Sequence, residues 1–166
     1  RIIPLYTQED NLLHLENLCR QNSALITVKP YQHFRVGLIT TGTEVFLGRI
    51  PDGFGPIVKS KFEAYGSEVC RQDIVPDDIS KIASAIHSQI AEGAQMVILT
   101  GGMSVDPDDQ TPAAIRACGA EVVSYGAPVF PGAMFMLAYL DGVPIVGLPG
   151  CVMYFRASIF DLTVPR

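Results

Sequence analysis

Apolar residues follow two patterns that alternate along most of the chain. Continuous apolar runs at residues 35–39, 96–99 and 143–148 predict buried strands. Apolar residues at intervals of three and four between residues 79 and 90 predict a helix with one apolar stripe. Further helices are predicted at residues 7–19, 57–65, 112–118 and 154–162, and further strands at residues 24–28, 68–75 and 121–125. Strands that alternate with helices predict an α/β fold, a three-layer sandwich with a mostly parallel sheet.

Polar residues and glycines mark the predicted helix ends. Thr7, Asp77 and Thr111 each precede a helical stretch. They are the predicted N-caps, because their side-chain oxygens can accept hydrogen bonds from free amides of the first turn. Pro112 suits the first helical position, since the amide that it lacks has no partner there. Gly66 is predicted to end the helix before it.

The composition indicates a folded domain. The chain has 166 residues, with 48% apolar and 17% charged, which excludes a disordered chain. Its net charge of −5, from 12 basic and 17 acidic residues, argues against a general nucleic-acid surface. No apolar run is long enough to cross a membrane. Residues 35–166 are predicted to form the domain and residues 1–34 an extension from a preceding region, and Arg1 in place of Met suggests a piece of a longer polypeptide.

The cysteines bear on the compartment. Cys19, Cys70, Cys118 and Cys151 are far apart in the sequence, without the paired spacing of a zinc site or a disulfide framework. They are interpreted as reduced thiols, which predicts a cytoplasmic location.

The segment from Thr100 to Pro112 carries the strongest functional signal. A buried strand leads into Gly101 and Gly102, which let the backbone turn sharply and approach a ligand. Carboxylates follow, and then a predicted helix N-terminus whose free amides favour an anion. Carboxylates repel phosphate unless a metal intervenes, so the combination suggests a phosphate-bearing ligand held with a divalent cation. The alternative is a surface loop in which the Asp residues only make turns.

Three other predicted loops follow strands, and in a parallel sheet they converge with this segment at the carboxyl edge. They are 41–44, 76–78 and 149–151. The candidate binding residues are Thr41, Gly42, Thr43, Glu44, Thr100, Gly101, Gly102, Met103, Ser104, Pro149, Gly150 and Cys151. Cys151 begins a predicted helix, where a thiol pKa can be depressed; the alternative is a small packing residue.

These motifs resemble those of a known family. Thr100 to Pro112 is similar to the T-G-G-x-S/G-x-x-x-x-D-x-T-P signature of the molybdenum-cofactor biosynthesis domain, the superfamily of MogA, MoaB and the central domain of MoeA. Together with residues 130–134 and 149–151, this motif most resembles the sequences of MoeA-related molybdopterin-binding proteins. The resemblance extends over residues 35–166.

The resemblance implies a function for specific residues. It implies a site for molybdopterin or its adenylate, with Asp77 and Asp109 as the catalytic and metal-binding acidic pair. If the domain is an enzyme, it implies Mg²⁺-assisted adenylyl transfer from ATP, or molybdate insertion, and it implies a homo-oligomer, dimer or trimer. The apolar residues 134–139 are predicted to form a core strand or ribbon, and part of this apolar ribbon is a candidate surface for self-association.

Two alternatives stay open. The motifs also resemble the CinA-type domain, which cleaves nucleotide pyrophosphates. A non-catalytic carrier or sensor of the cofactor is the other alternative. Gly53-Phe54 stands where relatives often have Asn, and Ala133 stands where they often have Lys, and both departures favour a carrier.

Overall fold

The structure is a computed structural model that describes residues 6–22 and 26–165. The chain divides into two compact units, residues 1–30 and residues 31–166. The first unit contains α1 (Glu9–Gln21), on which every residue is exposed. The helix predicted at 7–19 is confirmed with ends two residues later, but Thr7 is not its N-cap. Of the strand predicted at 24–28, residues 24 and 25 lie outside the described residues, and residues 26–28 form no strand.

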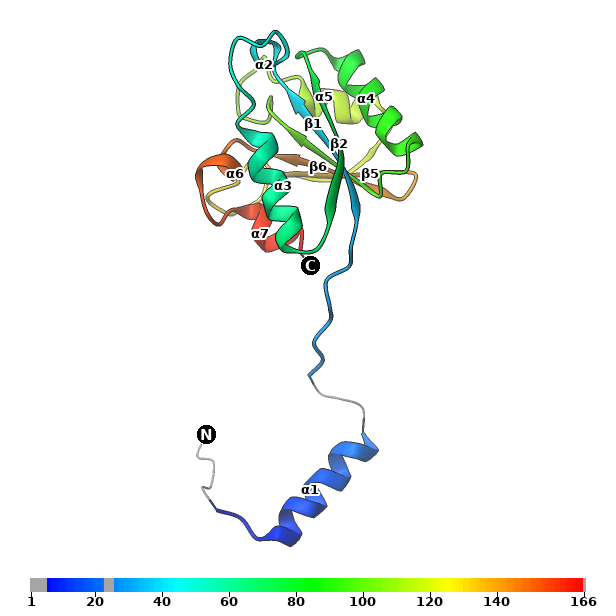
Figure 1. The fold of residues 1–166 in the computed structure, drawn as a ribbon, viewed down its shortest axis with the longest axis vertical. Helices are drawn as coiled ribbons and strands as arrows, with labels where there is room; N and C mark the ends of the chain where they lie inside the picture. The colour runs from blue at the N-terminus through cyan, green and yellow to red at the C-terminus, as the bar shows by residue number, and fades with distance from the viewer. Residues whose placement is uncertain (1–5, 23–25, 166) are drawn as a thin grey trace. The chain divides into compact units, whose positions relative to one another are not determined.

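The second unit is a three-layer α/β domain, as predicted (Figure 1). Its strands are β1 (Arg35–Thr41), β2 (Glu68–Val75), β3 (Met96–Thr100), β4 (Glu121–Tyr125), β5 (Met136–Leu140) and β6 (Val143–Leu148). Its helices are α2 (Thr43–Phe46), α3 (Phe54–Ala64), α4 (Ile79–Ala91), α5 (Thr111–Ala117), α6 (Cys151–Tyr154) and α7 (Ile159–Thr163).

One six-stranded sheet, in the order β2-β1-β3-β6-β5-β4, forms the middle layer. β2, β1, β3 and β6 are parallel to their neighbours, whereas β5 is antiparallel to both β6 and β4. The sheet is therefore mostly parallel, and the parallel strands end at one carboxyl edge. β4 also ends there, because two antiparallel pairings restore its direction to that of β6.

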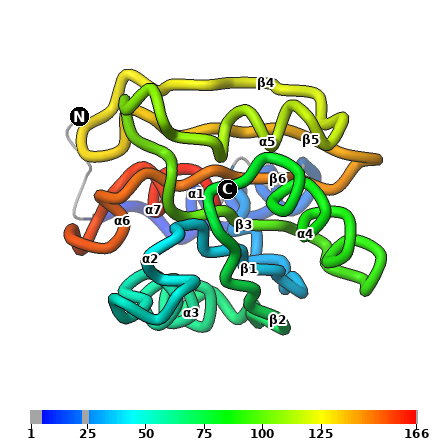
Figure 2. The backbone as a smooth tube through the Cα atoms, turned by 90° about the horizontal axis from the view of Figure 1, so that it is seen from above, coloured from blue at the N-terminus to red at the C-terminus, as the bar shows by residue number. Residues whose placement is uncertain are grey.

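Each face of the sheet has its own core, and Figure 2 shows helices on both sides of it. Ile39 packs on one face with Ile86 of α4 and Ile115 of α5. Its neighbour Leu38 packs on the other face with side chains of α3 and α7. Successive strand residues point to opposite faces, so a strand covered on both sides must be apolar throughout. This is why the continuous apolar runs were correct strand signals.

Two predicted N-caps are wrong by one residue. Asp78, not Asp77, caps α4, because its Oδ1 accepts a hydrogen bond of 2.9 Å from the Lys81 amide. Gln110 precedes α5, so Thr111 is already the first helical residue. The two side chains that do not cap, Asp77 and Thr111, are instead engaged between loops at the carboxyl edge.

The last predicted helix, at 154–162, is wrong because the chain forms two short helices there. Phe155 and Ser158 have extended backbone angles between α6 and α7. Ser158 begins α7 in a capping box with Asp161, whose carboxylate accepts from the Ser158 amide at 2.8 Å. The helix predicted at 57–65 begins earlier, at Phe54, and the short α2 was not predicted.

The described residues include no helix that is both long and apolar enough to span a bilayer. Cys19, Cys70, Cys118 and Cys151 are free thiols in the structure.

Candidate functional site

The loop after β1 and the loop after β3 are joined by buried hydroxyl groups. Thr111 Oγ1 donates to the Gly101 carbonyl oxygen at 2.9 Å and lies 3.1 Å from Thr41 Oγ1. Thr41 is 3% exposed and Thr111 is fully buried. The hydroxyls therefore hold the start of α5, the glycine turn and the end of β1 in one arrangement.

Gly101 and Gly102 are required by this packing. Both have positive φ angles, 85° and 52°, which non-glycine residues rarely adopt. A Cβ atom on Gly101 would overlap the Thr41 carbonyl oxygen, and one on Gly102 would lie 2.8 Å from Thr111 Oγ1. The sequence predicted a turn that admits a ligand, whereas the close approach in the structure is between two loops of the domain.

Several candidate binding residues are buried. Thr100 is fully buried at the end of β3, and Pro149 is also buried. Met103 is 2% exposed and packs in the core, where its thioether fills the space left by Gly147 of β6. These residues can offer a ligand only backbone groups. Thr43, Glu44 and Ser104 are exposed, and Gly42 and Gly150 are half-buried.

Asp77 connects the loops after β1 and β2. Its Oδ2 accepts a hydrogen bond of 2.9 Å from the Thr43 amide and one of 3.3 Å from the Thr43 hydroxyl. The Gly42 amide also donates to the Val75 carbonyl oxygen at 3.0 Å. Asp77 is exposed, so the rest of its carboxylate faces solvent.

Asp109 closes its own loop in a similar way. Its Oδ2 accepts a hydrogen bond of 2.6 Å from the Ser104 amide, and its side chain is half-buried. Asp106 and Asp108, in the same loop, are exposed. The acidic pair predicted for chemistry thus also determines the shape of two loops.

The hydrogen bonds of Asp77 and Asp109 bear on whether these carboxylates could bind a metal ion. Among residues 6–22 and 26–165, no three or more His, Cys, Asp or Glu side chains are placed to hold a metal by themselves. Mg²⁺ in phosphate sites uses one or two carboxylates together with substrate phosphates, so it needs no such group. In the described part of the chain, Oδ1 of Asp77 and Oδ1 of Asp109 accept no hydrogen bond. Each carboxylate therefore keeps one oxygen that no hydrogen bond within the described residues occupies.

The loop after β6 lies beside the glycine turn, because Leu148 pairs with Thr100 in the parallel ladder. It leads into α6, whose Met153 sulfur would lie 2.6 Å from a Cβ atom on Gly53, just before α3. The loops after β1, β2, β3 and β6 are thus linked at the carboxyl edge, as the sequence predicted.

The surroundings of Cys151 bear on the two interpretations of this residue, a reactive thiol or a small packing residue. Burial of the half-buried thiol raises its pKa, and this outweighs the hydrogen bonds of nearby backbone groups. The sulfur lies 3.8 Å from the Pro149 carbonyl oxygen. The raised pKa favours the packing interpretation of Cys151.

Asp52 occupies the N-terminus of α3. Its Oδ1 accepts from the Phe54 and Gly55 amides at 2.9 and 3.1 Å. Its Oδ2 accepts from Gln72 Nε2, which also donates to Thr40 Oγ1 at 3.2 Å. Both carboxylate oxygens are taken, so the amides at the start of α3 are already satisfied by the chain itself.

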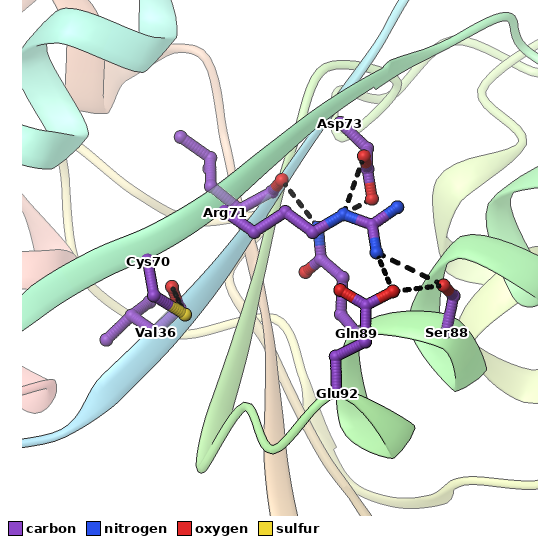
Figure 3. A network of polar contacts seen from close by, with 8 residues as sticks. Val36, Cys70, Arg71, Asp73, Ser88, Gln89 and Glu92 are labelled. Carbon is purple, nitrogen blue, oxygen red and sulfur yellow. Dashed lines mark hydrogen bonds and ion pairs between the residues drawn. The ribbon is translucent and has the colours of Figure 1, made fainter.

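A second polar cluster lies between β2 and α4 (Figure 3). Arg71 binds Asp73 at 3.0 Å, and also Glu92 and Ser88. Gln89 is 1% exposed and donates to the Leu38 carbonyl oxygen and to Asp73. A cavity of about 80 Å³ lies beside these residues. Sequence analysis did not predict this cluster, because its polar residues come from a strand and a helix with no local motif.

In three-layer α/β domains of this kind, ligands bind at the carboxyl edge of the sheet. The chain belongs to the family described as "probable molybdopterin binding domain", whose model matches residues 37–166. This confirms the resemblance seen in the sequence.

Relatives with two different names match part of the chain. A CinA-like protein of Mycobacterium sp. (strain JLS) is 34% identical over 90 residues, which cover 54% of this chain and 21% of that protein. A molybdopterin molybdenumtransferase of Synechococcus elongatus is 30% identical over 111 residues, which cover 62% of this chain and 28% of that protein. The matched segments therefore span less than a third of either relative.

A solved structure shows the same fold. The crystal structure of the molybdopterin biosynthesis enzyme MoaB from Thermus thermophilus superposes with a TM-score of 0.60 at 23% identity, covering 70% of this chain and 81% of that chain.

Proposed function

We propose that the domain binds molybdopterin, or a phosphate-bearing derivative such as its adenylate, at the carboxyl-edge loops. The observation that carries this proposal is the linkage of the family's signature loops by Thr41, Thr111 and Asp77. Loops that are fixed in advance lose little conformational entropy when they bind a ligand. Family membership supplies the ligand class.

In this proposal, Asp77 Oδ1 and Asp109 Oδ1 hold Mg²⁺ together with a phosphate of the ligand. The ion supplies the positive charge without which these carboxylates would repel a phosphate. Residues 126–135 contain no Lys or Arg, so the segment in which relatives often have a lysine offers no cation. Backbone amides of the glycine turn and exposed Ser104 would orient the ligand.

A decisive experiment measures molybdopterin binding by titration calorimetry with and without Mg²⁺. The double variant Asp77→Asn, Asp109→Asn should lose the Mg²⁺-dependent part of the affinity, roughly tenfold or more. Asn keeps a carbonyl oxygen for the Thr43 and Ser104 amides, so the loops should stay folded. The matched control is Asp108→Asn, which removes an exposed carboxylate from the same loop. Affinity that is unchanged by Mg²⁺ and by the double variant would contradict the assignment of the acidic pair.

The same site raises the question of catalysis. Incubation with molybdopterin, ATP and Mg²⁺ would give an AMP-linked product if the domain transfers an adenylyl group. A pure carrier would bind the pterin and give no product. Both results agree with the binding proposal, and they separate the enzyme from the carrier.

A second candidate is hydrolysis of a nucleotide pyrophosphate, which the sequence resemblance to CinA-type domains implies. The 34% identity to a CinA-like protein favours testing it. Release of a mononucleotide from a nucleotide pyrophosphate, abolished by Asp109→Asn, together with no affinity for molybdopterin, would replace the first proposal with this one.

A further inference from the structure

The segments that leave or enter the sheet at its carboxyl edge form a continuous set, here called the carboxyl-edge rim. The topology places one segment after each of β1, β2, β3 and β6, and one between β4 and β5. These segments are residues 42–53, 76–78, 101–110, 126–135 and 149–158.

The rim exposes large apolar side chains. Phe130 is 90% exposed, Val105 is 80% exposed and Tyr154 is 76% exposed. Further exposed apolar residues of the rim are Phe46, Leu47, Ile50 and Phe155. Single exposed apolar residues are normal, but their concentration on one part of a surface marks an interaction site. Aromatic residues in particular dominate the binding energy of protein interfaces.

The rim also carries the whole net charge of the chain. Its acidic residues are Glu44, Asp52, Asp77, Asp78, Asp106, Asp108 and Asp109, and its basic residues are Arg49 and Arg156. Two basic and seven acidic residues give a charge of −5. The chain as a whole has 12 and 17, so the remaining residues have ten of each and no net charge. The net negative charge of the chain therefore lies in the same segments that expose these apolar side chains.

We propose that the carboxyl-edge rim is a docking surface for a different protein, one that presents Lys and Arg side chains among apolar side chains. Apolar and aromatic side chains of the rim supply the buried contacts. Its carboxylates steer a basic partner and select against wrong ones.

Other occupants fit this surface poorly. A second copy of the chain docked rim to rim would bring two surfaces of charge −5 together, and like charges across an interface oppose binding. Nucleic acids and anionic lipid surfaces carry the same sign of charge as the rim and are repelled in the same way. A basic protein surface with apolar residues matches both features at once. The inference goes beyond the proposed function and does not depend on it.

The test uses a defined probe, a synthetic peptide of about a dozen residues that alternates lysine with leucine and phenylalanine. Its binding to the complete chain is followed by ¹H–¹⁵N NMR. We expect saturable shifts of backbone amides in the rim segments, and at least tenfold weaker binding of an oligolysine peptide with the same charge. The triple variant Val105→Ser, Phe130→Ser, Tyr154→Ser should also weaken binding at least tenfold. The matched control, Val123→Ser with Leu162→Ser, removes exposed apolar side chains elsewhere and should leave binding unchanged.

Three results would overturn the proposal. One is a set of shifts spread over the whole surface, another is equal affinity for oligolysine, and the third is undiminished binding by the triple variant. Sedimentation equilibrium supplies a further criterion, since a dimer that the triple variant abolishes would make the rim an interface between copies. Each single substitution is measured as well, with an unchanged urea midpoint as the control for folding.

Discussion

At Gly101 and Gly102 the predicted turn is correct, but the reason for the two glycines differs from the predicted one. The sequence placed two glycines at a sharp turn, and the positive φ angles of both residues confirm that turn. The space that they leave is filled by Thr41 and Thr111 of the same domain. A bulky substitution there would disturb the loops before it could report on a ligand. The hydroxyl groups are therefore the better residues to change.

Thr111 offers such a change. Replacing it by Val keeps the shape and removes the hydroxyl, so the Gly101 carbonyl and the buried Thr41 hydroxyl lose a partner. We expect Thr111→Val to lower the free energy of unfolding by about 1–2 kcal/mol in urea denaturation. Thr111→Ser keeps the hydroxyl and should cost less. A Val variant as stable as the Ser variant would show that the hydroxyl contacts contribute nothing.

The acidic residues illustrate what a motif leaves undetermined. The sequence identified Asp77 and Asp109 by position, but it could not show that each binds a backbone amide of a loop. It also assigned the α4 cap to Asp77 and not to Asp78. Adjacent carboxylates are equally good caps by propensity, and only the path of the backbone decides between them. The positions of these carboxylates in the loops could be predicted from the sequence, whereas their hydrogen-bond partners could not.

At the scale of helices and strands, periodicity was reliable where an element is long and covered on one or both faces. The stripe of α4 and the apolar runs of β1 and β3 gave elements close to those observed. The region after β6 failed because residues 155–158 are extended and divide it into two short helices. Ser158 followed by Asp161 is a capping-box pattern, and it marks the start of the second of these helices, α7. Short helices with explicit caps need that local signal, because they are too short for a periodic pattern.

Contacts between elements lead to a second prediction, at Gly37 of β1. A Cβ atom there would overlap Gln89 Oε1, so Gly37→Ala should displace the Gln89 side chain from its partners between β1, β2 and α4. The expected loss is about 2–3 kcal/mol of unfolding free energy, from overpacking and broken buried hydrogen bonds.

A double-mutant cycle identifies the cause of that loss. Gln89→Ala alone removes the hydrogen bonds, and adding Gly37→Ala to it should cost little more, since the overlapping group is gone. Full additivity of the two losses would mean that Gly37 matters for some reason other than Gln89.

At the scale of the whole molecule, the fold class followed from the alternation of strands and helices, and the family from ordered motifs. The antiparallel β5 was not separable from the pattern, because β5 and β6 both have apolar residues that face the core. The concentration of negative charge on the carboxyl-edge rim could not be predicted from the sequence pattern either. The net charge of −5 can be counted from the sequence, but only the topology shows that the segments of the carboxyl-edge rim carry all of it. Self-association stays a prediction, although Met136 and Ala138 of the apolar ribbon are buried in the core.

The stability of the whole domain should depend on pH through the contact between α3 and α7. Lys61 Nζ lies 2.8 Å from Asp161 Oδ1, and both side chains are largely buried. Burial by itself would raise the pKa of Asp161, but hydrogen bonds from Lys61 and from the Ser158 amide outweigh it and lower that pKa. A carboxyl group with a lowered pKa in the folded state contributes stability above its unfolded pKa of about 3.9, and this contribution is lost as the pH falls towards the folded pKa.

Asp161→Asn isolates this contribution. Asn keeps an acceptor for the Ser158 amide but leaves Lys61 without its counter-charge, so the variant should be less stable by about 2 kcal/mol at about pH 7. Because protonation removes the same charge from the wild type, the difference between the two urea midpoints should shrink as the pH is lowered below about 4. Glu63→Gln on the exposed side of α3 controls for the removal of one carboxylate. A difference that persists unchanged down to about pH 2.5 would mean that the ion pair does not connect α7 to the rest of the domain energetically, and that the apolar contacts of Phe160 suffice to hold it.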